Sequence, residues 1–134
     1  MSENREGHSV LIVSSTDKSA AILGRLVTGI IPSDIVAVRS GSEARRSAET
    51  EAGDLVIVNC PLSDEFGHDL AADLAEDTSA GVILLAASDV FEDVSDKVEA
   101  SGVLTVSKPV SRPLFEQAVF LALATHRRLA GYEK

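Results

Sequence analysis

Short apolar runs alternate along the chain with longer segments of helical period. The runs are rich in β-branched residues, and strands buried on both faces of a parallel sheet have this composition. They cover residues 10–13, 35–38, 55–58, 82–85 and 103–106.

The intervening segments predict five helices. The first follows possible N-capping residues at 14–17 and ends before Gly29 and Pro32. The second and third are expected at 41–51 and around 70–74. The fourth spans about 91–100, and the long last helix begins at 111 or 112, carries Pro113 in its first turn and continues through 129.

Regular alternation of this kind predicts an α/β fold with five βα units and a doubly wound, parallel, five-stranded sheet. The flavodoxin-like strand order 2-1-3-4-5 fits best, and a site is then expected at the carboxyl ends of the strands. We expect a tail at 1–8, one domain at 9–125, and an extension of the last helix at 126–134.

Charge and composition exclude several functions. The net charge of -9 disfavours direct binding of nucleic acid by this segment, and the basic cluster at 126–128 is typical of the last turn of a helix. Cys60 is the single cysteine, so no internal disulfide is possible, and we expect a small buried side chain. No apolar stretch reaches membrane-spanning length, and residues 1–6 contain no signal-peptide core, which favours a cytoplasmic protein.

The predicted strand ends carry few groups that could do chemistry. Ser14 and Ser15 follow the first strand, Asn59 the third, Ala86 the fourth and Lys108 the fifth. The first turn after a strand contains no glycine, and the chain has no P-loop sequence, so no cradle for nucleotide phosphates is visible. We therefore expect no cofactor.

Over residues 8–125 the chain resembles the receiver domains of bacterial two-component response regulators. The resemblance rests on the strand at 10–13, on residues 54–59 followed by Leu62 and Gly67, and on the sequence Ser-Lys-Pro at 107–109. It implies the fold described above, and it raises the odds of a cis Lys108–Pro109 bond.

The chain departs from that family where phosphorylation would occur. Ser14 and Ser15 stand where the resemblance places an acidic pair, and Asn59 stands where it places the aspartate that accepts phosphate; only Lys108 matches. An amide cannot be the nucleophile of an acyl phosphate, and uncharged oxygens are poor substitutes for the carboxylates that bind Mg²⁺.

Two further positions have also changed. Ala86 replaces the family's Thr or Ser after the fourth strand, and Thr105 replaces its frequent aromatic residue on the fifth. An alanine side chain cannot donate a hydrogen bond to a phosphoryl oxygen.

Other titratable residues near the strand ends have ordinary interpretations. Asp17 suits the first turn of a helix, and Asp64 and Glu65 suit a solvated loop. His68 is expected at the surface, without a second ligand at metal-binding spacing, so no metal is predicted.

The sequence thus predicts a degenerate receiver that is not an enzyme. It would act in signal transduction as a phosphorylation-independent module for protein interaction or dimerisation. Its face would comprise the fourth helix, the fifth strand and the fifth helix, with candidate residues Val90, Phe91, Val94 and Thr105. Phe115 and Val119 are expected in the core.

The long last helix resembles the one that leads to an RNA-binding output in ANTAR-type antiterminators, which would imply transcription regulation. Such an output is not among these residues.

Three alternatives remain open. The vacated pocket of Ser14, Ser15, Asn59, Ala86 and Lys108 could sense a small anion or ligand. A non-standard residue could be phosphorylated, making the domain a working receiver. Ser14 or Ser15 could form a Ser–Lys arrangement with Lys108 in a small enzyme, although such a lysine would need a lowered pKa.

Overall fold

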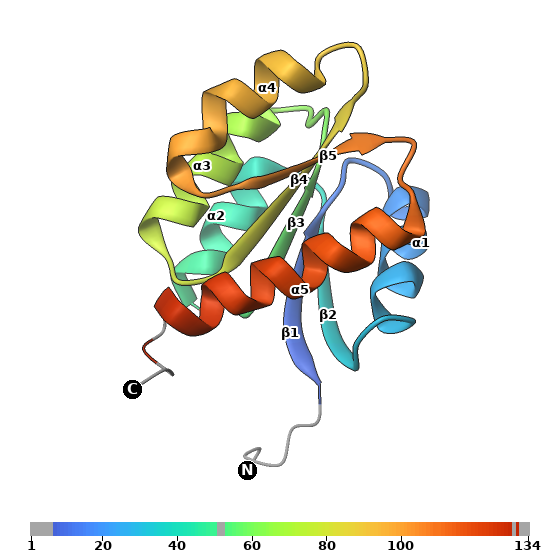
Figure 1. Cartoon of the computed structure of the whole chain (residues 1–134), viewed down its shortest axis with the longest axis vertical. Helices are drawn as coiled ribbons and strands as arrows, with labels where there is room; N and C mark the ends of the chain where they lie inside the picture. The colour runs from blue at the N-terminus through green and yellow to red at the C-terminus, as the bar shows by residue number, and fades with distance from the viewer. Residues whose placement is uncertain (1–6, 51–52, 130, 132–134) are drawn as a thin grey trace.

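A parallel five-stranded sheet forms the centre of the computed structural model, which describes residues 7–50, 53–129 and 131 (Figure 1). The strand order is β2-β1-β3-β4-β5, as the sequence predicted. The strands are β1 (His8–Val13), β2 (Ser33–Val38), β3 (Leu55–Asn59), β4 (Gly81–Ala87) and β5 (Leu104–Lys108). The helices are α1 (Asp17–Thr28), α2 (Gly41–Thr50), α3 (Gly67–Asp77), α4 (Phe91–Val98), the short 3₁₀ helix η2 (Glu99–Ser101) and α5 (Arg112–Leu129).

Several predicted boundaries were wrong by a few residues. Ala86 and Lys108 lie inside their strands and do not follow them. Helix α3 extends well beyond the predicted 70–74, because polar residues on its outer side continue the helix without adding to the apolar stripe. The predicted end of the second helix at Glu51 lies outside the described residues, as do 1–6, 130 and 132–134 of the predicted tail and extension.

The three central strands are buried on both faces. Alternate side chains face opposite layers: Leu11 and Val13 pack toward α2, α3 and α4, whereas Val10 and Ile12 pack toward α1 and α5 (Figure 1). Phe115 and Val119 are fully buried in the second layer, which confirms that they are core residues. Within the described residues, no helix is long and apolar enough to cross a membrane.

Local contacts fix the ends of the outer helices. Thr16 caps α1 by accepting a hydrogen bond from the Ser19 amide at 3.2 Å. The Arg112 guanidinium at the start of α5 donates to the Gly29 carbonyl at the end of α1, at 3.1 Å.

The Lys108–Pro109 bond is cis, as the resemblance implied.

A buried histidine fastens the end of α5 to the amino-terminal edge of the sheet. His126 is 8% exposed. Its Nδ1 lies 2.9 Å from the Ser79 carbonyl oxygen, and its Nε2 lies 2.9 Å from Asp54 Oδ1. The other oxygen of Asp54 accepts a hydrogen bond from the Ser9 amide at 2.9 Å. These contacts join α5 to β1 and β3.

We expect His126→Ala to lower the free energy of unfolding by about 2 kcal/mol, because it leaves the part-buried Ser79 carbonyl and Asp54 carboxylate without their ring partner. Urea denaturation would measure the change. Arg128→Ala, an exposed neighbour on the same helix, is the control and should change stability by less than about 0.5 kcal/mol. Equal effects of the two substitutions would contradict the role assigned to His126.

Candidate functional site

Three polar residues meet at the carboxyl edge of the sheet and hydrogen-bond to one another. Asn59, the last residue of β3, donates through Nδ2 to Ser14 Oγ at 3.1 Å. Lys108, the last residue of β5, reaches past the end of β4 and donates through Nζ to Asn59 Oδ1 at 3.0 Å. The Lys108 ammonium also donates to the Cys60 carbonyl. We call Ser14, Asn59 and Lys108 the polar triad.

Lys108 is the only charged member of the polar triad. Its ammonium donates to two neutral acceptors of this chain, Asn59 Oδ1 and the Cys60 carbonyl. Lys108, the one residue that matches the family pattern at this edge, thus bonds to Asn59 and to a backbone carbonyl.

The other two predicted pocket residues lie apart from the polar triad. Ser15 is exposed to solvent. Ala86 is fully buried in β4 and lies under a neighbouring groove. Asp17, the nearby carboxylate that follows β1, forms an exposed ion pair with Arg39 at 3.1 Å. The geometry therefore brings together a serine, an amide and a lysine. Within the described ranges, no three His, Cys, Asp or Glu side chains gather as metal ligands.

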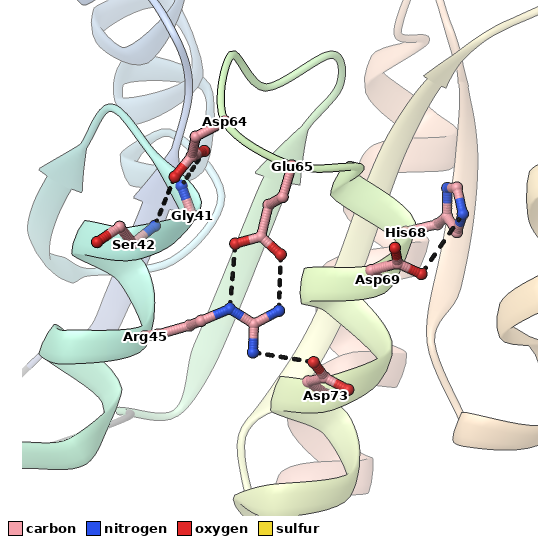
Figure 2. A network of polar contacts seen from close by, with 8 residues as sticks. All are labelled: Gly41, Ser42, Arg45, Asp64, Glu65, His68, Asp69 and Asp73. Carbon is pink, nitrogen blue, oxygen red and sulfur yellow. Dashed lines mark hydrogen bonds and ion pairs between the residues drawn. The ribbon is translucent and has the colours of Figure 1, made fainter.

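The loop after β3 is fastened to helix α2, and Asp64 makes the first attachment (Figure 2). Its carboxylate accepts hydrogen bonds from the backbone amides of Gly41 at 2.9 Å and Ser42 at 3.0 Å. These are free N–H groups at the start of a helix, which favour a negative charge. The two backbone hydrogen bonds, the Gly41 bond first, lower the pKa of Asp64.

Glu65 makes the second attachment. The Arg45 guanidinium donates to its two carboxylate oxygens at 3.0 and 2.7 Å and pairs with Asp73 of α3 at 2.9 Å (Figure 2). The hydrogen bond with Glu65, opposed in part by burial, raises the pKa of Arg45 above its ordinary value. Glu65 also crosses directly over Gly41, where a Cβ atom would lie 1.9 Å from its Oε2. A residue with a side chain at position 41 would displace Glu65.

The expectation that Asp64 and Glu65 are merely solvated loop residues is therefore wrong. Both side chains bind α2, whose residues lie 20 to 23 positions earlier in the chain. No local spacing signals such contacts. Gly41 was the one indication, because it opens a helix without a side chain of its own.

A groove lies between this loop and α4, next to the polar triad. It has a volume of about 600 Å³. Its floor includes the buried residues Gly67, Ala86 and Val94. The walls and rim are formed by Cys60, Pro61, Leu62, Ser63, Glu65, Phe66, His68, Val90, Asp93 and Lys97. We call this the α4 groove.

Two residues of the α4 groove differ from their sequence-based interpretation. Cys60 is only half-buried and lines the groove; burial raises the pKa of its thiol, and the Lys108 charge opposes this. His68 is largely covered and stacks on the Phe66 ring, with centroids 5.3 Å apart. Phe66, which is 69% exposed and lines the groove, was not among the residues predicted for interaction.

The predicted interaction residues are not equally accessible. Val90 is 44% exposed. Phe91 and Thr105 are partly exposed, and Val94 packs in the core beneath α4. The Thr105 hydroxyl oxygen is buried without a hydrogen-bond partner among the described residues. Val90 is thus the most exposed of the four.

Comparison with known proteins identifies the architecture. No protein-family profile matches the sequence, and no curated protein sequence is significantly similar. Solved structures do match over nearly the whole chain. The signal receiver domain of an HD domain-containing protein from Pseudomonas fluorescens Pf-5 is 23% identical, with 92% of each chain covered and a TM-score of 0.79.

Two further structures have the same fold. A response regulator receiver domain protein from Clostridium thermocellum is 16% identical, with 90% of this chain and 98% of that chain covered and a TM-score of 0.77. The signal receiver domain of a signal transduction histidine kinase from Syntrophus aciditrophicus is 24% identical, with coverages of 87% and 90% and a TM-score of 0.74. The predicted resemblance to receiver domains is confirmed, and the chain has the receiver fold.

Asp64→Ala should destabilise the protein at neutral pH and have progressively less effect below about pH 4. The pKa of this carboxyl is lowered in the folded state, so its stabilising contribution is present above the unfolded pKa and is lost as the pH falls through the folded pKa. Urea denaturation from pH 7 downward would measure the difference.

Asp64→Asn is the matched control, since it keeps one acceptor oxygen but no charge. It should cost less stability at pH 7 than Asp64→Ala. A difference between wild type and Asp64→Ala that does not change with pH would contradict the capping role.

Proposed function

We propose that the chain is a degenerate receiver domain that works in signal transduction through protein contacts, without being phosphorylated and without enzymatic activity. The hydrogen-bonded polar triad is the observation that carries this proposal. In the resemblance to receivers, Asn59 occupies the position of the phosphate acceptor. In this structure its amide accepts a hydrogen bond from the Lys108 ammonium and donates one to the Ser14 hydroxyl.

The chemistry of these groups supports a loss of phosphorylation. An amide nitrogen and a buried serine offer no carboxylate to attack a phosphodonor. Neutral oxygens bind a divalent cation only weakly. Asp17 could have replaced a lost carboxylate, but it pairs with Arg39.

The residues on the fourth and fifth strands where receivers respond to phosphorylation also support the proposal. Ala86 has no donor for a phosphoryl group, and Thr105 has no aromatic ring that could move in response to one. A protein partner or a second copy would bind the face formed by α4, β5 and α5, where Val90 is exposed. Helix α5 continues to Leu129, which fits the resemblance to receivers that precede an output domain and so a role in transcription regulation. A cytoplasmic location agrees with this role.

Phosphorylation can be tested directly with acetyl phosphate and Mg²⁺, followed by intact-mass analysis. The wild type should gain no phosphoryl group. The double variant Asn59→Asp, Ser15→Asp is the positive control, because it restores two carboxylates. Ser15 is the better position for the second carboxylate, since it is exposed whereas Ser14 is fully buried.

A base-labile phosphate on the wild type would overturn the proposal, and peptide mapping would then identify the non-standard acceptor. Phosphorylation of the double variant alone would support it, because the fold would then lack only the carboxylates.

A further inference from the structure

We propose that the α4 groove is a docking site for a basic amphipathic segment of a partner protein. The inference rests on the proposed function only in taking the domain to work through a protein partner. It places the contact beside the β3–α3 loop, in a groove that shares Val90 with the α4-β5-α5 face.

The groove offers apolar contacts that are already accessible. Phe66 is 69% exposed and Val90 is 44% exposed, and both line the groove. Leu62 and the buried Ala86 and Val94 also line it. Large aromatic side chains beside an apolar cavity are typical anchors of protein interfaces.

The loop that forms one wall of the groove is attached to α2 in the free protein. Asp64 and Glu65, the two residues immediately before Phe66, are both bonded to α2 (Figure 2). His68 stacks against the Phe66 ring. Because the loop is already ordered, binding there loses little conformational entropy.

The negative charge around the groove favours a basic partner. Residues 62–100, which include α3 and α4, contain eleven acidic residues and a single basic one, Lys97. The Arg45 guanidinium forms ion pairs with Glu65 and Asp73. The Lys97 ammonium lies 3.7 Å from an oxygen of the Asp93 carboxylate. The remaining exposed carboxylates on the two helices include Asp69, Glu76, Glu92 and Asp96. A segment with apolar anchors and flanking Lys or Arg complements this surface.

A small apolar molecule fits the groove less well. Ligand pockets usually enclose most of their ligand, whereas much of this rim consists of exposed residues, Pro61, Ser63, Phe66, Val90, Asp93 and Lys97. An open groove with charged edges suits an elongated segment that continues beyond it.

The test uses a synthetic helical peptide of leucine and lysine, with leucines at i, i+3, i+4 and i+7. Binding to the full chain is measured by fluorescence anisotropy and by amide chemical shifts in NMR spectra. We expect shifts around Phe66 and Val90, and weaker binding at higher salt. Phe66→Ser should weaken binding about tenfold or more. Phe120→Ser, the matched exposed phenylalanine on α5 at 51% exposure, should leave affinity unchanged.

Asp93→Lys provides a second variant that keeps the apolar groove and reverses one rim charge; it should also weaken binding. Circular dichroism establishes that each variant is folded. A scrambled peptide of the same composition should bind much more weakly, because its leucines do not share a face.

Four outcomes would overturn the inference. They are no binding of the peptide, equal binding of the scrambled peptide, equal effects of Phe66→Ser and Phe120→Ser, and groove shifts that appear on concentrating the protein alone. The last would identify the groove as a contact between copies of this chain. None of these results depends on whether the wild type accepts phosphate, so failure here is distinguishable from failure of the proposed function.

Discussion

Burial of β1, β3 and β4 on both faces is the constraint on which the rest of the structure depends. Strands covered on both sides must be apolar throughout, so polar groups can appear only where the strands end. Parallel pairing then brings the carboxyl ends of the strands to one edge of the sheet. Ser14, Asn59 and Lys108 meet for this reason, although they are separated by up to 94 positions, as their numbers show.

The same edge is held together by hydrogen bonds between side chains. A lysine surrounded by carboxylates would be part of a charged, hydrated cluster. With an amide and a hydroxyl in their place, the three side chains satisfy one another, and Lys108 also bonds to the Cys60 carbonyl that opens the loop after β3. The edge thus connects the ends of β1, β3 and β5 through hydrogen bonds in which the Lys108 ammonium is the one charged group.

The sequence was sufficient for the fold. Its predicted pocket contained the three residues of the polar triad, but also Ser15 and Ala86, which lie apart from it. Apolar runs and helix-ending glycines are local signals, and the order of parallel strands follows from few permitted topologies. Contacts at the loop after β3 could not be predicted in this way. Arg45 meets Glu65 and Asp73 only because α2 and α3 pack side by side, and Asp64 reaches Gly41 only because the loop turns toward α2. His126 gave a similar result: the basic run at 126–128 reads as the solvated end of a helix, yet its first residue is buried against Asp54.

The two attachments of the loop after β3 also affect how quickly the neighbouring surface can be used. A wall that is held by Asp64 and Glu65 needs no rearrangement before contact, so encounter with a charged partner is limited by diffusion and orientation and not by opening of the loop. In the proposed complex, long-range attraction by the acidic helices would set the association rate, and the fit around Phe66 would set the lifetime. A signalling domain built this way would respond to the local concentration of its partner, with no covalent step to reverse.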